Sequence, residues 1–348
     1  MINKLALQQL LKCPITGHDL RWLTQDELNN LNQRFEPVSP IVEALKSEQH
    51  DIFYPVIEDI LYLLPDLALR QDCEVPSANG GVQLTKQEVK EFYDNFGWKA
   101  SLGIYQDAKD SEDLRDVSRD YIKKCHLRLK KYLPSKGEYL LDVASGPIQY
   151  PAYLSYSEQY NYRICADISL RALQEAKKKL GDKGIYLLCD VTRLPLKNNK
   201  IDAVVSLHTL YHVPKDEQLL AFSELYRVLK PQGKSVVVYS WGRHSLLMRL
   251  FLLPQKLFSF IKRKLISKKG ETLYFYAHPY QWFSSEIAAH YSTELFSWRS
   301  VNVPFLKTFV HGLLGGKNLL KVIFWLEERF PYYMGRFGAY PVFVSVKK

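Results

Sequence analysis

The feature that most constrains the fold is a regular alternation of short apolar runs with helical patterns between residues 139 and 240. We expect strands at residues 139–143, 162–166, 185–188, 203–207 and 234–240. The helical patterns that separate them fall at residues 147–156, 169–180 and 215–229. Strands that alternate with helices form a parallel sheet with helices on both faces. The sequence therefore predicts an open α/β sheet.

An aspartate stands at the end of each of the first three predicted strands. These residues are Asp142, Asp167 and Asp190. Ligands of open α/β sheets bind at the carboxyl ends of the strands, and a carboxylate after the second strand is placed to accept hydrogen bonds from ribose hydroxyls. The three acids together predict a site for a ligand that contains a nucleoside.

The loop after the first strand restricts the kind of nucleoside. A pyrophosphate needs several glycines so that backbone N–H groups can approach its oxygens, and Gly146 is the single glycine in residues 144–148. A dinucleotide is therefore disfavoured. An adenosyl group with an uncharged or zwitterionic tail needs one close approach, and an ammonium group on that tail suits Asp142.

The stretch from residue 139 to 241 resembles the class I S-adenosylmethionine-dependent methyltransferases of the ubiquinone-biosynthesis type. The resemblance lies in LLDVASGP (140–147), ADIS (166–169), CDV with LPL (189–196), IDAVVS (201–206) and ELYRVLKP (224–231). The first and third glycines of the family's first motif are Ala144 and Ile148 here. The resemblance implies a Rossmann-like mixed sheet of seven strands, in which five parallel strands are followed by a hairpin of residues 295–301 and 340–346.

The same resemblance assigns site residues for S-adenosylmethionine. The loop 144–146 would hold the methionine part, Asp167 the ribose and Asp190 the adenine. The full set implied for cofactor binding is Tyr93, Asp142, Ala144, Ser145, Gly146, Asp167, Ile168, Asp190, Val191, Leu207 and His208. His208 and His212 are candidate catalytic groups on the acceptor side, and we expect no metal.

The rest of the chain predicts accessory parts. Residues 1–80 form a small α+β module that resembles the zinc-ribbon-like proteins that activate methyltransferases, but Thr16 stands where a second cysteine would follow Cys13. A zinc site needs about four N or S ligands, so we expect a degenerate, metal-free module. Residues 84–133 are expected to form a helical cover over the cofactor. The methyltransferase domain would span 134–348, with helical insertions at 243–278 and 305–333.

The basic character of the chain is concentrated in one segment. The net charge is +10, and residues 241–270 contain eight Lys or Arg and no Asp or Glu. Leucine and phenylalanine alternate with these basic residues, and Pro254 interrupts the pattern. Three interpretations stay open: a buried helical insertion with snorkelling lysines, an interfacial element at 243–269 that contacts anionic lipid, and an RNA-binding surface.

Location and function follow as expectations. The five cysteines form no C-x-x-C pair, no apolar run of about 18 residues is present, and the first eleven residues lack the pattern of a secretory peptide. We therefore expect a cytoplasmic protein, with a location peripheral to a membrane as the alternative. The expected reaction is methyl transfer to a small-molecule or lipid- or glycan-linked acceptor. The alternatives are an RNA methyltransferase and a non-catalytic cofactor-binding partner subunit.

Overall fold

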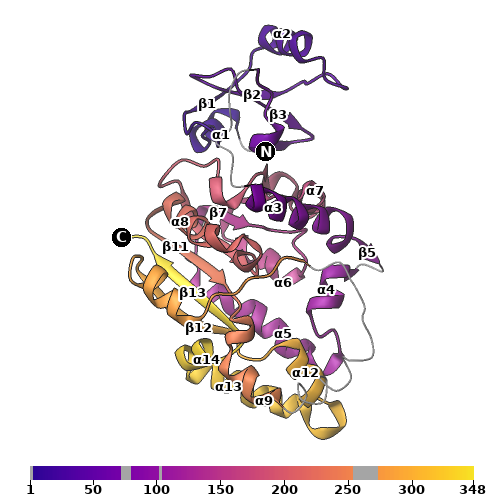
Figure 1. Cartoon of the computed structure of the whole chain (residues 1–348), viewed down its shortest axis with the longest axis vertical. Coiled ribbons are helices and arrows are strands. Elements are labelled where there is room, and N and C mark those ends of the chain that lie inside the picture. Colours follow the sequence, from indigo (N-terminus) through magenta and orange to yellow (C-terminus); the bar gives the residue numbers. More distant parts are fainter. Residues whose placement is uncertain (1–2, 72–79, 102–103, 254–272) are drawn as a thin grey trace.

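The molecule is built around one large mixed sheet (Figure 1). The computed structural model describes residues 3–71, 80–101, 104–253 and 273–348. Within these residues the large sheet has eleven strands in the order β1-β2-β3-β4-β9-β8-β7-β10-β11-β13-β12. The bounds are β1 Leu20–Trp22, β2 Ala44–Ser47, β3 Phe53–Ile57, β4 Ile60–Tyr62, β7 Gly137–Val143, β8 Tyr160–Asp167, β9 Gly184–Leu188, β10 Ile201–Leu207, β11 Leu229–Val238, β12 Thr293–Arg299 and β13 Tyr340–Val346.

Seven of these strands form the sheet that the sequence predicts. β7 to β11 run parallel, and β13 pairs antiparallel with both β11 and β12. Alternate residues of one strand enter two separate core clusters, as Leu141 and Leu140 of β7 do. Strands buried on both faces read as continuous apolar runs, which explains the sequence pattern. The predicted class I methyltransferase fold is confirmed.

The helices between these strands follow local capping signals. α7 (Leu170–Leu180) begins after Ser169, whose hydroxyl accepts from the Ala172 N–H, and ends at Gly181 with φ of 52°. α8 (Gln218–Val228) precedes β11. The predicted helix at 147–156 is wrong in length. α6 covers Pro151–Leu154 alone, because the proline ring fixes the first helical turn and leaves residues 144–150 as an open loop.

The first 71 residues extend the same sheet at one edge. β4 pairs in parallel with β9, so the N-terminal strands continue the methyltransferase sheet. The Lys12 N–H donates to Pro195 O, the Lys197 N–H donates to Leu10 O, and Leu11 is fully buried in the common core. This N-terminal unit also holds α1 (Lys4–Leu10) and α2 (Gln25–Phe35) and lies at one end of the molecule (Figure 1).

Thr16 stands where the resemblance would place a second cysteine, and the residues around Cys13 make ordinary polar contacts. Cys13 is buried, its Sγ lies 3.1 Å from Tyr54 Oη, and the Thr16 N–H donates to it. Among the residues that the structure describes, no group of three or more His, Cys, Asp or Glu side chains gathers as a metal site would need. The module's likeness to methyltransferase activators stays a prediction.

The segment before β7 covers the carboxyl ends of the central strands. It contains α3 (Gly80–Phe92), a π-helical turn (Tyr93–Gly97), α4 (Gln106–Ser111) and α5 (Asp116–Arg128). This segment is mainly helical, with two short strands, β5 (Ala100–Ser101) and β6 (Ile104–Tyr105), between its helices, and its role as a cofactor cover stays a prediction.

The helical insertions lie at the end of the molecule away from the N-terminal unit (Figure 1). They are α9 (Leu246–Phe251), α12 (Val303–Phe309), α13 (Gly316–Arg329) and α14 (Pro331–Phe337). A short helix, α11 (Tyr280–Trp282), runs into a π-helical turn at Phe283–Ala288. Most of the predicted basic segment, residues 254–272, lies outside the described residues. In the described part of the chain, none of the helices has the length and apolar character needed to span a bilayer.

Candidate active site

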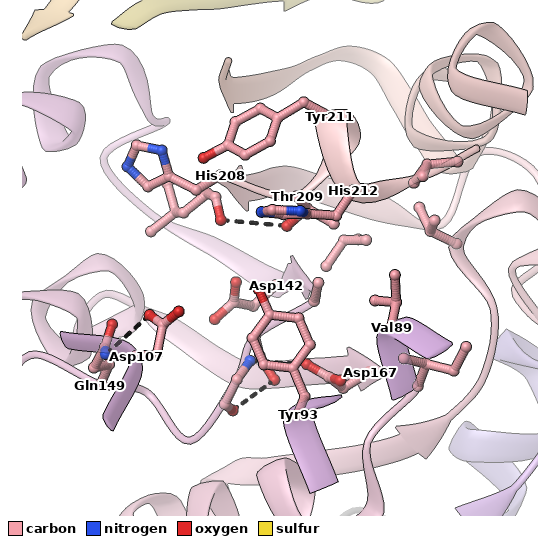
Figure 2. A pocket seen from close by; sticks show the side chains of 18 of the residues that line it. Val89, Tyr93, Asp107, Asp142, Gln149, Asp167, His208, Thr209, Tyr211 and His212 are labelled. Atoms are coloured by element: carbon pink, nitrogen blue, oxygen red, sulfur yellow. Dashed lines mark hydrogen bonds between the residues drawn. The ribbon is translucent and has the colours of Figure 1, made fainter. Parts of the chain in front are cut away.

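A cavity of about 230 Å³ opens at the carboxyl ends of β7, β8, β9 and β10. All the residues that the sequence predicts for cofactor and acceptor line this one cavity: Tyr93, Asp142, Ala144, Ser145, Gly146, Asp167, Ile168, Asp190, Val191, Leu207, His208 and His212. Figure 2 shows Tyr93 entering from one side and His208 and Tyr211 from the other. The topology therefore gathers the predicted site residues in one place, while their individual roles stay predictions.

The loop after β7 has a left-handed backbone at residues that are not glycine. Ala144 and Ile148 both have φ of 50°, and Gly146 has φ of 54°. Such conformations cost non-glycine residues on the order of 1 kcal/mol each, and they concentrate at ligand sites. A Cβ on Gly146 would stand 3.0 Å from the Trp98 ring, so a larger residue there would crowd this ring in addition to being strained at this φ.

Asp167 closes this loop from the end of β8. Its Oδ2 accepts from the Gly146 N–H and its Oδ1 accepts from the Ser169 N–H, both at 2.9 Å. Burial raises the pKa of Asp167 to about 6. Each carboxylate oxygen keeps further acceptor capacity, so the group fits the ribose hydroxyls of an adenosyl ligand.

Asp190 lies beside a lysine that the sequence analysis did not single out. Lys86 Nζ, on α3, is 2.6 Å from Asp190 Oδ2 and 2.6 Å from Glu217 Oε2. The other Asp190 oxygen accepts from the Thr192 N–H at 2.8 Å. The cover helix is thus tied by charge to the strand end where the adenine is expected.

Asp142 is held in a buried ion pair. The Arg163 guanidinium donates to Asp142 Oδ2 through Nε at 3.1 Å and through Nη2. Both side chains are at least 95% buried, and Arg163 Nη1 also donates to Tyr153 O. The positive charge of Arg163 compensates the negative charge of the Asp142 carboxylate, which lines the cavity. The ion pair also joins the end of β7 to β8.

The cover places two aromatic rings over the loop. Tyr93 and Trp98 stack with centroids 4.8 Å apart, and Asp94 between them accepts from Ser169 Oγ. Burial raises the pKa of the Tyr93 phenol, which stays neutral. These contacts place both rings in the wall of the cavity beside the loop after β7.

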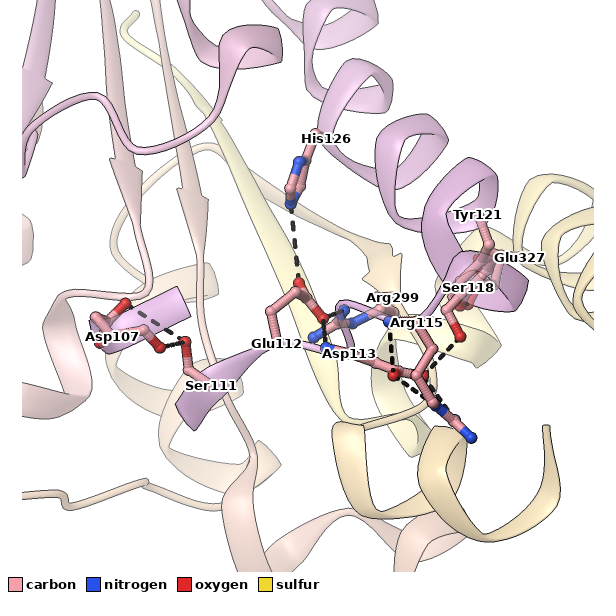
Figure 3. A network of polar contacts seen from close by, with 10 residues as sticks. All are labelled: Asp107, Ser111, Glu112, Asp113, Arg115, Ser118, Tyr121, His126, Arg299 and Glu327. Carbon is pink, nitrogen blue, oxygen red and sulfur yellow. Dashed lines mark hydrogen bonds and ion pairs between the residues drawn. The ribbon is translucent and has the colours of Figure 1, made fainter. Parts of the chain in front are cut away.

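The opposite end of the cavity is aromatic and contains groups that the sequence analysis missed. His208 has φ of 61° and contacts Trp298 and Tyr340, with centroids 4.5 and 5.4 Å away. Arg299 is fully buried and donates to Glu112 Oε1 at 2.6 Å (Figure 3). Burial lowers the pKa of His208 well below its usual range and that of His212 to about 4, so both imidazoles are neutral at pH 7.

Asp107 is a further missed residue at this end. Gln149 Nε2 donates to Asp107 Oδ2 at 3.2 Å, and the carboxylate points into the cavity (Figure 2). Burial raises the pKa of Asp107. In the sequence, Asp107 stands among Lys109, Asp110 and Glu112 and resembles a solvated helix face. The order of polar and apolar residues around Asp107 therefore does not indicate that its side chain points into the cavity.

Comparison with known proteins identifies a methyltransferase domain in this part of the chain. Residues 141–237 match the family described as "Methyltransferase domain". The chain is 36% identical over 104 residues to a ubiquinone/menaquinone biosynthesis C-methyltransferase of Desulfotalea psychrophila. This alignment covers 30% of this chain and 41% of that protein. The chain is 26% identical over 238 residues to the enzyme of the same name from Coxiella burnetii. This alignment covers 66% of this chain and 85% of that protein.

A likeness to solved structures is also found. Magnesium protoporphyrin IX methyltransferase from Synechocystis, solved with bound SAM, aligns over 78% of this chain and 99% of its own, with 12% identity and a TM-score of 0.43.

Residues 141–237 match a methyltransferase domain, and the fold around them is that of the class I enzymes. The chain carries an S-adenosylmethionine-dependent methyltransferase domain, and S-adenosylmethionine is its cofactor. More particularly, the domain is similar to the ubiquinone/menaquinone biosynthesis C-methyltransferases, although the first of these alignments spans less than half of that relative.

Proposed function

We propose that the protein transfers a methyl group from S-adenosylmethionine to a carbon atom of a small, lipid-soluble acceptor that carries a hydroxyl group. The observation that carries the proposal is the cavity with two unlike ends. One end presents Asp167 and Asp190. The other end combines the charged Asp107, Glu112 and Arg299 with the aromatic side chains Tyr150, Tyr153, Tyr211, Trp298 and Tyr340. Aromatic walls with a few polar groups suit a flat, apolar molecule.

The relatives support the same class of acceptor. Several are named as C-methyltransferases of ubiquinone/menaquinone biosynthesis, and another is a sterol 24-C-methyltransferase of Pneumocystis carinii, 28% identical over 159 residues. Ubiquinone, menaquinone and sterols are all lipid-soluble. The resemblance is to the methyltransferase domains of these relatives. For this chain we therefore propose a class of acceptor, a lipid-soluble molecule, and no particular compound.

The cofactor side needs little more than positioning. S-adenosylmethionine supplies an electrophilic methyl group when it is bound. Asp167 and Asp190 would hold its adenosine, and the loop 144–146 would hold its methionine part. The stacked rings of Tyr93 and Trp98 would cover the methionine part from the other side of this loop. Alignment of the reacting atoms then accounts for most of the rate enhancement.

On the acceptor side, the new carbon–methyl bond would form as the S–CH3 bond breaks, with S-adenosylhomocysteine as the leaving group, and one proton must leave overall. The Asp107 carboxylate would accept the proton of the acceptor hydroxyl, because desolvation makes it a stronger base than an exposed aspartate, and the proton on the methylated carbon would then move to the hydroxyl oxygen. Gln149 orients the carboxylate through its amide. The neutral His208 and His212 rings line the space between the two ends.

The proposal is tested with methyl-labelled S-adenosylmethionine and a cell extract divided into lipid, RNA, protein and small-molecule fractions. We expect label in the lipid fraction. Asp167→Ala should abolish labelling and calorimetric cofactor binding, while the exposed Asp120→Ala should change neither. Label in RNA or protein alone, or no label in any fraction, would contradict the proposed acceptor.

A further inference from the structure

An unusual set of apolar side chains faces solvent at the end of the molecule that holds the helical insertions. We define the apolar end surface by Leu250, Phe251, Phe309, Leu313 and Leu314. We propose that this surface binds an anionic lipid bilayer. The inference is independent of methyl transfer, since it concerns where the protein resides rather than what it modifies.

The exposure of these residues is large. Leu313 is 102% exposed and Leu314 is 80% exposed. Phe251 of α9 contacts Phe305 of α12 with centroids 5.6 Å apart, and Phe305 contacts Phe309 at 4.9 Å. The two helices are therefore neighbours, and the chain passes directly from α12 to the two leucines. The phenylalanines of the two helices therefore pack together, and the exposed leucines follow α12 within a few residues.

The turn that carries the leucines is well defined. The N–H groups of Leu314 and Gly316 both donate to His311 O, at 3.2 and 2.9 Å. Gly315 has φ of 72°, and a Cβ on Gly316 would stand 2.6 Å from His311 O. Because two glycines and two hydrogen bonds fix this turn, the leucines are held outward by the backbone.

Basic residues predominate in the segments that carry the surface. Residues 241–253 and 300–326 contain no Asp or Glu. The exposed basic residues of the described part of these segments are Arg243, Arg249, Lys307, Lys317 and Lys321. The acid that comes within 4 Å of them is Asp116, 3.9 Å from Lys317. Exposed leucine and phenylalanine side chains surrounded by Lys and Arg match the interface of an anionic bilayer, where apolar groups enter and cations contact the headgroups.

The surface is connected to the acceptor end of the cavity. Arg299 of β12 lines the cavity, and the chain then enters α12 at Val303. The Leu306 carbonyl of α12 accepts from Arg115, which also binds Asp113, the neighbour of Glu112. If the proposed function holds, a bilayer at this surface would lie on the acceptor side of the enzyme.

The experiment is co-sedimentation of the whole protein with vesicles, in the absence of cofactor and acceptor. We expect binding to vesicles of phosphatidylcholine with about one third phosphatidylglycerol, weaker binding to pure phosphatidylcholine, and loss of affinity as salt is raised. Leu313→Ser with Leu314→Ser should lower the partition coefficient at least about tenfold, because two exposed leucines no longer enter the bilayer.

The matched control is Val38→Ser with Val42→Ser, two apolar residues of the N-terminal unit that are 107% and 73% exposed. This control should bind vesicles as the unmodified protein does. Equal loss in both double variants, or no vesicle binding, would overturn the proposal. So would a dimer in sedimentation velocity that only the leucine variant dissociates, or RNA that competes fully with vesicles. Calorimetry of cofactor binding separates these results from a failure of the proposed function.

Discussion

Asp167 is the residue whose charge state should be most visible in cofactor binding. Its pKa of about 6 lies above the usual value for aspartate because burial disfavours the carboxylate. Ribose hydroxyls donate hydrogen bonds to the ionised form, so a bound adenosyl ligand should lower this pKa. The residue therefore couples proton release to cofactor binding.

We expect the affinity for S-adenosylmethionine to rise between about pH 5 and pH 6 and to level off above pH 6. Binding near pH 6 should release protons, because the free protein is partly protonated there and the complex is not. Calorimetry in two buffers of different ionisation enthalpy measures the number released. Proton uptake on binding, or an affinity that does not change with pH, would contradict the assignment of Asp167.

Asp107 leads to a second prediction at the same scale. Asp107→Asn should lower kcat by about 10²- to 10⁴-fold, because the amide cannot accept a proton, while the cofactor Kd stays unchanged. With the unmodified protein, activity should rise with pH through the raised pKa of Asp107, and the variant should lose this limb.

Asp120→Asn is the control, since Asp120 is exposed on α5 and, unlike Asp110, is not one of the charges that raise the pKa of Asp107. It should keep the activity and the pH profile. A variant at Asp107 that keeps the pH profile would remove this residue from the proton transfer.

At the scale of elements, the loop after β7 has Ala144 and Ile148 at two positions where the first motif of the family has glycine. Ala144→Gly should leave the free energy of unfolding unchanged or raise it by up to about 1 kcal/mol, because glycine has no penalty at φ of 50°. Ala144→Val should lower it by about 1–3 kcal/mol, because a β-branched side chain is strained there. Urea unfolding measures both. A glycine variant that is less stable than the valine variant would show that the loop is not strained.

The sequence predicts the central elements well because their signals are local. Strands β7 to β10 appear as continuous apolar runs, and Ser169 and Gly181 mark both ends of α7. The π-helical turn at Tyr93–Gly97 and the short strands β5 and β6 were not predicted. In this region Trp98 packs against Gly146, 48 positions later in the chain, and stacks on Tyr93, and a contact at this separation leaves no periodic pattern in the sequence.

The acceptor end shows the same limit at the scale of the whole molecule. Glu112 and Arg299 form a buried pair across 187 positions, and Asp107 meets Gln149 across 42. Neither contact has a local signature, since each residue taken alone resembles a surface charge. The cofactor end was predictable because each of its acids follows its own strand, so the fold alone brings them together.

The N-terminal unit and the methyltransferase domain should unfold as one body. Leu11 is fully buried in the common core, so Leu11→Ala should lower the free energy of unfolding by about 2–5 kcal/mol. Scanning calorimetry should show a single transition that moves to lower temperature as a whole. The exposed Leu5→Ala is the control and should leave the transition in place. Two separate transitions, with only the first moved, would indicate independent folding.

The pairing of β4 with β9 has a consequence for synthesis of the chain. Ile60 aligns with Tyr186, 126 positions later, so the first strands leave the ribosome long before their partner exists. Until then the edge of β4 is unpaired, and unpaired edges recruit other strands. A nascent chain halted between these two positions should depend on chaperones for solubility, and one released after Leu188 should not.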